Sequence, residues 1–191
     1  MRFGMSFQSI CEWLANTPGS IALHESLWGY PIVESVHVLT MCLFLGMIVM
    51  LDLRLLSLTM RTVPVSQVAG RLLPWARAGF AVMVITGALL FYAIPVRAFH
   101  NIFFRIKVVT LILAGLNVWA FHSTVFRSVA EWDLDPVLPK RARMAGAVSL
   151  VLWATIVVAG RMIAYNWFDC DRQPQPSIVN LLAGCDANSP E

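Results

Sequence analysis

The sequence predicts an all-α membrane protein, a four-transmembrane-helix bundle with a short N-terminal interfacial helix. Of its 191 residues, 58% are hydrophobic and only 13% are charged, whereas about 25% of the residues in a soluble domain are charged. The apolar residues are concentrated in four runs, each long enough to cross the hydrocarbon core of a bilayer. The net charge of +3 comes from scattered basic residues without a basic stripe or interleaved aromatics, so we expect no nucleic-acid partner.

Residues 1–30 form the predicted interfacial segment. Within residues 5–15, apolar side chains recur at helical spacing, which predicts a short amphipathic helix on the membrane surface. Residues 16–19 end that helix, and residues 20–28 predict a second short one, with Trp28 and Tyr30 as anchors at headgroup level. Polar residues interrupt the whole segment, so it lacks the apolar core of a cleavable signal peptide.

Four spans follow this segment. They are predicted over residues 31–52, 75–95, 104–126 and 144–167. Residues 31–167 therefore form the transmembrane domain, and the proline-rich residues 168–191 form an irregular extracytoplasmic tail.

Basic residues set the predicted orientation in the membrane. Loops one and three, with the start of span two, hold eight of them: Arg54, Arg61, Arg71, Arg77, Arg127, Lys140, Arg141 and Arg143. The opposite side holds six: Arg2, Arg97, Arg105, Lys107, Arg161 and Arg172. Because the more basic loops stay in the cytoplasm, both termini are predicted to lie outside it. Cys170 and Cys185 in the tail then lie where a disulfide can persist.

The first span carries an acid and an imidazole where apolar residues are expected. Glu34 and His37 are three residues apart, so they project from the same side of a helix. Ionisable groups inside a membrane span cost free energy and usually mark a functional site. The candidate site is therefore placed around this pair.

A second histidine, His122, is predicted at a different depth. With a rise of roughly 1.5 Å per residue, His37 lies about 7 Å to the outer side of the bilayer centre and His122 about 10 Å to the inner side. A separation of about 17 Å along the membrane normal is too large for ligands of one metal ion, which lie about 2 Å from it. If both histidines are ligands, they serve two centres.

Heme b is the cofactor that fits the outer position. A neutral histidine in a helical bundle can ligate iron, and cations near the water interface can neutralise the heme propionates. Arg105, Lys107 and Arg161 are predicted at a suitable depth, and Glu34 lies near them. These residues and His37 form the predicted heme-binding set in the outer leaflet.

The remaining ligands are left open by the sequence. His100 or His24 could supply the second axial ligand of the outer heme, and His122 could hold an inner heme. The prediction is a membrane b-type cytochrome-like hemoprotein with one or two hemes, acting in electron transfer. A quinone or an extracytoplasmic redox protein is the expected partner. The pattern does not decide between a membrane oxidoreductase and an electron carrier.

Two other classes compete with the hemoprotein. A copper- or metal-handling protein or transporter would use His37, Glu34 and span methionines, since soft ligands suit Cu(I). In a non-catalytic assembly subunit, Glu34 and Arg161 would form a structural ion pair and small residues would pack helices into a homo-oligomer. In that class His37 and His122 would only hydrogen-bond to neighbouring helices.

Several stretches resemble an uncharacterised family of bacterial four-span integral membrane proteins, a domain of unknown function. They are ESLWGYPIVESVHVL with LDLRLLSL, RLLPWARAGF with TGALLF, FFRIKVVTLILAGLNVWAFH, and AGRMIAY. The motifs occur in this order along the chain, and the resemblance covers roughly residues 10–165. The resemblance implies four spans in a bacterial inner membrane and no assigned reaction. The motif positions that it carries onto this chain are Glu34, His37, Asp52, Arg54, Lys107, Asn117, His122 and Arg161.

Overall fold

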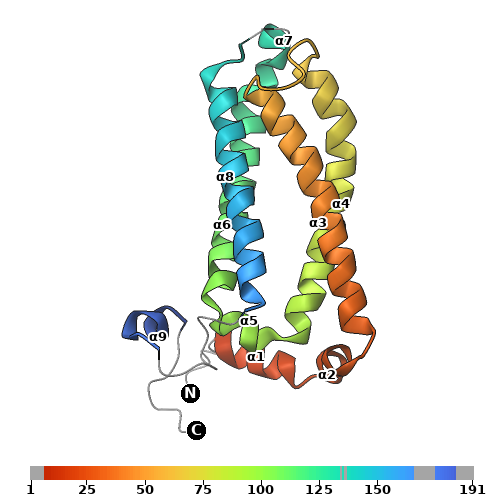
Figure 1. The fold of residues 1–191 in the computed structure, drawn as a ribbon, viewed down its shortest axis with the longest axis vertical. Coiled ribbons are helices and arrows are strands. Elements are labelled where there is room, and N and C mark those ends of the chain that lie inside the picture. The colour runs from red at the N-terminus through yellow and green to blue at the C-terminus, as the bar shows by residue number, and fades with distance from the viewer. Residues whose placement is uncertain (1–6, 134, 136, 166–174, 184–191) are drawn as a thin grey trace. The chain divides into compact units, whose positions relative to one another are not determined.

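The protein is built around four helices that are long and apolar enough to cross a membrane. The computed structural model describes residues 7–133, 135, 137–165 and 175–183, and no strand occurs among them. The candidate spans are Gly29–Leu55, Val65–Ala93, Ile102–Trp132 and Lys140–Ile163 (Figure 1). They expose large apolar side chains such as Leu43, Trp119 and Val151, as expected of helices that face lipid. The predicted fold class is confirmed, and the chain is a multi-pass membrane protein.

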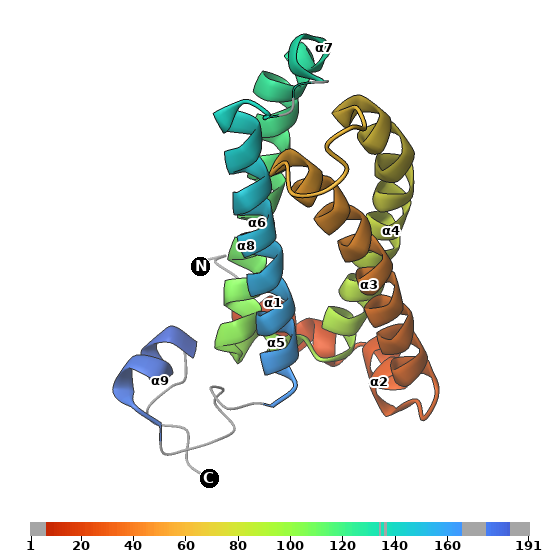
Figure 2. The same ribbon diagram turned by 45° about the horizontal axis from the view of Figure 1, so that its top comes forward.

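The described chain divides into two compact units, and each unit holds a segment of every span. The first unit comprises residues 1–36, 85–108 and 157–191, and the second comprises residues 37–84 and 109–156. The spans are α3 (Gly29–Leu55), α4 (Val65–Ala93), α6 (Ile102–Ala120) with the helical turns that continue it to Trp132, and α8 (Lys140–Ile163). The elements of both units can be followed along the chain in Figure 2.

Three short helices characterise the first unit. α1 (Phe7–Ala15) and α2 (Pro18–Glu25) confirm that two short helices precede the first span, and α5 (Pro95–His100) lies between α4 and α6, where the sequence predicted a plain loop. α1 packs against α5 and buries Cys11. Burial raises the pKa of the Cys11 thiol, because the thiolate would lose its hydration.

Tyr92 joins the interfacial helices to the end of α4. Its hydroxyl lies 2.7 Å from the Thr17 hydroxyl, and its carbonyl accepts a 2.7 Å hydrogen bond from the Ser20 hydroxyl. α2 starts directly after Thr17, with Pro18 at its first position, where a missing N–H costs nothing. These two hydrogen bonds therefore hold the N-terminal segment to the end of α4.

The C-terminal tail contains a helix that the sequence did not predict. α9 (Ser177–Ala183) is one short helix in a segment that was predicted to be irregular. Its leucines, Leu181 and Leu182, are exposed. Cys170 and Cys185 lie outside the described residues, so their disulfide stays a prediction.

Aromatic packing organises the middle of the second unit. A buried cluster joins all four spans and consists of Phe44, Ala76, Met83, Ala114, Trp153 and Ile156. The Phe44 and Trp153 rings meet edge to face with their centroids 4.8 Å apart, a geometry that adds stabilisation beyond the buried area. Met41 and Met47 pack against this cluster. These two methionines of α3 therefore serve as core residues.

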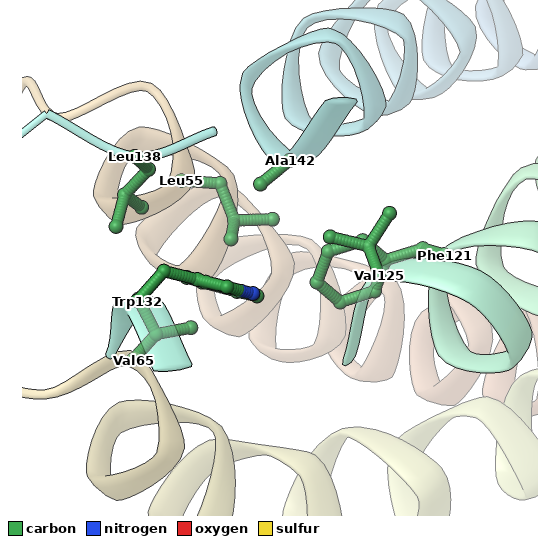
Figure 3. Packing of buried hydrophobic residues seen from close by; sticks show 7 residues of the cluster. All are labelled: Leu55, Val65, Phe121, Val125, Trp132, Leu138 and Ala142. Carbon is green, nitrogen blue, oxygen red and sulfur yellow. The ribbon is translucent and has the colours of Figure 1, made fainter. Parts of the chain in front are cut away.

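A second cluster closes the loop end of the same unit (Figure 3). Its side chains come from α3, α4, α8, the turns after α6 and the loop before α8, and are Leu55, Val65, Phe121, Val125, Trp132, Leu138 and Ala142. α6 reaches this cluster through a π-helical turn (Phe121–Val125), a 3-10 turn (Phe126–Ser128) and α7 (Val129–Trp132). The third span thus continues six residues beyond its predicted end.

α4 begins ten residues earlier than predicted, because Pro74 does not end it. The sequence predicted a linker up to Pro74 and a span from residue 75, yet Pro74 lies inside α4. Val65, Val68 and Ala69 are buried at helical spacing in the preceding turns. Their packing offsets the one backbone hydrogen bond that the proline removes.

The fully buried Arg54 ties the end of α3 to the loops around it. Its side chain is 0% exposed. Its Nε donates a 2.8 Å hydrogen bond to the Val63 carbonyl, and its Nη2 lies 3.5 Å from the Asp133 carbonyl. The Asp133 carboxylate in turn accepts bonds from the backbone N–H and the hydroxyl of Ser66 in the first turn of α4. A carboxylate is favoured there by the helix dipole.

The backbone of the linker after α3 is strained at two residues. Ser57 and Met60 have positive φ values of 59° and 48°, a region that residues with a Cβ rarely adopt. Arg61 Nε donates a 2.6 Å bond to the Ser57 carbonyl, and the Ser57 hydroxyl accepts a bond from the Leu138 N–H. The surrounding bonds therefore hold the turn in place.

Arg54→Ala should lower the free energy of unfolding by about 3 kcal/mol, because it leaves buried carbonyl groups without a donor. Arg54→Lys should recover only part of this loss, since one ammonium group cannot reproduce the guanidinium fork. Unfolding in mixed micelles with increasing dodecyl sulfate measures both. Arg71→Ala, at an exposed position of α4, is the control that should change little, and an equal loss there would contradict the assignment.

Gly146→Ala should destabilise the protein by about 1–3 kcal/mol through overpacking. A Cβ at this position of α8 would lie 3.1 Å from both the Asp52 carbonyl oxygen and the Leu55 Cβ. Gly115→Ala is the matched control, because its Cβ would meet nothing within 4 Å. The same unfolding titration compares the two variants. Equal stability of both would show that α3 and α8 are not in such close contact.

Candidate functional site

His37 lies on the buried face of α3 in the second unit. It is 9% exposed, and Phe44 and Leu51, seven and fourteen residues further on, are buried too. Residues seven apart share one face of a helix, so the imidazole points toward the core. His37 also interacts within the protein. Of the four histidines, His37 is the only buried one; His24 is exposed, and His100 and His122 are half-buried.

Glu34, which was predicted to share this site, has a different environment. It is exposed, although it lies only three residues before His37. An exposed carboxylate keeps its own solvation or faces headgroups, whereas a buried imidazole needs a partner. The two side chains are therefore not buried together.

His122 is held in the π-helical turn that follows α6. Its Nδ1 lies 3.1 Å from the Val118 carbonyl oxygen, so this nitrogen carries the proton in the neutral ring. Nε2 then keeps its lone pair. The ring lies between Phe121 and Phe126, with centroid distances of 5.6 and 5.2 Å. π-Helical turns frequently occur at functional sites, and this ring has the tautomer of a metal ligand.

Arg105 is bound to carbonyl groups in the first unit. Its three nitrogen atoms donate to the carbonyls of Phe99, Leu182 and Ala183 over 3.0, 2.6 and 2.9 Å. His100 Nδ1 lies 3.2 Å from the same Ala183 carbonyl. A cation at the last carbonyls of α9 compensates the negative end of its dipole. Arg105 and His100 therefore hold the tail helix.

The other two predicted cations lie on different helices of this unit. Lys107 on α6 points to α8, where a Cβ on Gly160 would lie 3.7 Å from its Nζ. Arg161 is exposed on α8, donates a 2.9 Å hydrogen bond to the Tyr165 hydroxyl and covers that ring at 4.9 Å. The Arg161 guanidinium group is thus engaged by Tyr165 rather than by Glu34, which the alternative of a structural ion pair required.

Asn101 directly precedes the first residue of α6. Its side-chain oxygen accepts bonds from the Phe103 and Phe104 N–H groups over 3.0 and 3.3 Å, so it caps the helix. The residue is buried, and its Nδ2 has no hydrogen-bond partner in the part of the chain that the structure describes. Its short polar side chain followed by an apolar run is the signal that could have found this cap in the sequence.

Two deeply buried charged residues are ones that the sequence did not include in the candidate site. Asp52 and Arg54 are 4% and 0% exposed. Asn117, another motif position, donates a 3.1 Å bond from its side chain to the Ala145 carbonyl and so links α6 to α8. Among the described residues, no group of three or more His, Cys, Asp or Glu side chains could hold a metal ion.

These features define a polytopic helical membrane protein with separate buried polar groups. A family model described as a family of unknown function, DUF6644, matches residues 25–166. The match covers well over half of the chain, and the protein belongs to this family, as the sequence motifs predicted. No curated protein and no solved structure matches the chain.

Arg105→Ala should release α9 and raise the rate of proteolytic cleavage near the C-terminus roughly tenfold, for a loss of about 1.4 kcal/mol in hydrogen bonding. Limited proteolysis of the purified protein, followed by mass spectrometry, measures the rate. Arg97→Ala, an exposed position on α5, serves as the control and should be cleaved like the wild type. Unchanged cleavage of Arg105→Ala would remove the role of this residue in holding the tail.

Proposed function

We propose that this protein is a b-type hemoprotein that carries electrons in the bacterial inner membrane. His37 is the proposed ligand of a heme in the outer leaflet. The observation that supports this most is the burial of His37 on the core-facing side of α3. Ionisable groups at such a position of a span usually mark a functional site, and ligation of heme iron by histidine is an established use of an imidazole.

His122 is the proposed ligand of a second, inner heme. The bond of its Nδ1 to the Val118 carbonyl leaves Nε2 available as the donor atom. Ligating histidines usually donate their other ring N–H to a carbonyl or a carboxylate in this way, which fixes the ring orientation. The two histidines would then serve separate centres, and a heme at each would supply one-electron chemistry.

The role that the sequence suggests for Lys107, which we keep as a proposal, is to neutralise the propionates of the outer heme. Arg105 already donates to carbonyls, and Arg161 binds Tyr165. Lys107, in contrast, points toward Gly160 of α8. We assign Lys107 to charge neutralisation and leave Arg105, Arg161 and Glu34 as surrounding residues of the proposed site.

The proposed orientation places both termini in the periplasm. It rests on the excess of basic residues in loops one and three. A quinone in the bilayer or a periplasmic redox protein would exchange electrons with the outer heme in this orientation.

One observation favours an assembly subunit as the second candidate. The arginines Arg54, Arg105 and Arg161 all bind groups of the protein itself, as they would in a chain whose polar residues only specify packing. His37 interacts within the protein as well. In this alternative, the chain forms a homo-oligomer or joins a larger complex and binds no cofactor.

An absorption spectrum of detergent-purified protein, expressed with a heme precursor, distinguishes the two candidates. We expect a Soret band and, after reduction, the sharp α band of a b-type center. His37→Ala should lose the outer heme and His122→Ala the inner one, so the heme content per chain should fall in each variant. A colourless but folded wild type would overturn the proposal and leave the assembly subunit.

His24→Ala is the matched control for these spectra. His24 is exposed on α2, so its loss should leave the heme content unchanged. His100→Ala tests the last predicted metal ligand: unchanged heme content would assign His100 to the tail helix alone, where its Nδ1 meets the Ala183 carbonyl.

A further inference from the structure

Asp52 is a buried carboxyl group in the last turn of α3. It is 4% exposed and lies in the second unit. The Ser149 hydroxyl on α8 donates a hydrogen bond to it, while its Oδ2 has no partner in the described part of the chain. Ser149 is buried as well. One carboxyl oxygen of Asp52 is thus hydrogen-bonded, and the other has no hydrogen-bond donor among the described residues.

α3 and α8 pack closely at the level of Asp52. A Cβ added to Gly146 of α8 would lie 3.1 Å from the Asp52 carbonyl oxygen, so the two helices approach closely at this level. A sodium or calcium ion would need about six oxygen ligands. No group of three or more acidic, histidine or cysteine side chains lies together in the residues described. A single proton needs only the one unbonded oxygen.

Among the residues that the structure describes, no cation is positioned to neutralise an ionised Asp52. Arg54 lies two residues away and therefore projects from a different side of the helix. Its guanidinium group binds the Val63 and Asp133 carbonyls. His122 is engaged by the Val118 carbonyl, and Asp133 is negative and caps α4. The basic residues of the neighbouring helix segments are exposed and are Arg71, Arg77, Lys140, Arg141 and Arg143.

We propose that Asp52 is a proton-binding site, a carboxylic acid that holds one proton in the folded protein. An ionised carboxylate that is buried without a counter-charge costs far more free energy than the neutral acid. When the contact between α3 and α8 opens, the O–H bond breaks, the proton passes to water and a carboxylate remains. Asp52 lies only three residues, or about 4.5 Å of helix rise, from the end of α3, so the proton exchanges with the side where α3 ends.

Infrared spectroscopy at neutral pH tests this site directly. The protein should be purified in a maltoside detergent, which has no carbonyl group of its own. We expect the C=O stretching band of a protonated carboxylic acid that shifts in D₂O and is lost in Asp52→Asn. Asp135→Asn is the matched control, because Asp135 is exposed; this variant should keep the band. The experiment does not depend on heme content.

A second variant keeps the test decisive if Asp52→Asn does not fold. Ser149→Ala removes the hydrogen bond to the carboxyl group, so the same band should move to higher frequency. A wild-type spectrum without a protonated carboxylic acid band overturns the proposal. So does a band that survives in folded Asp52→Asn, or one that Ser149→Ala leaves in place.

Discussion

Complete burial of one guanidinium group organises the loop end of the second unit. Arg54 cannot lose its charge, and a buried charge is tolerated only where fixed dipoles replace its hydration. The Val63 and Asp133 carbonyls supply those dipoles. Their positions fix the linker after α3 and the turn after α7, and Asp133 then caps α4. The cluster of aromatic and aliphatic side chains around Trp132 belongs to the same end of the unit. The linker after α3, the turn after α7 and the cap of α4 therefore all depend on the Arg54 side chain.

The spans were predictable because a membrane imposes length and composition on any helix that crosses it. The four apolar runs, the two interfacial helices and the family therefore followed from the sequence. Local patterns could not reveal where Arg54 finds its acceptors, since Val63 and Asp133 are separated from it by nine and by seventy-nine residues. The start of α4 was predicted too late for the same reason, because the packing that keeps the helix intact around Pro74 comes from other helices.

The candidate site was predictable to a lesser degree. The sequence singled out His37, and it is the one buried histidine, but the spacing of Glu34 and His37 could not tell which side chain faces the core. Arg105 and Arg161 were selected by depth alone, whereas α9 and Tyr165 decide what they bind. Asp52 drew less notice than His37, although its burial is deeper. The depth of a residue along its span can be read from the sequence. The direction in which its side chain points depends on packing partners that lie far away in the chain.

The anchoring of the N-terminal helices has a consequence for biosynthesis. α1 packs on α5, and Thr17 meets Tyr92, so α1 and α2 must wait for partners that are synthesised about eighty residues later. Two spans have to be translated before this segment can settle. During that interval its aromatic side chains have only the lipid surface or a chaperone to cover them, which makes the order of synthesis part of how this protein reaches its fold.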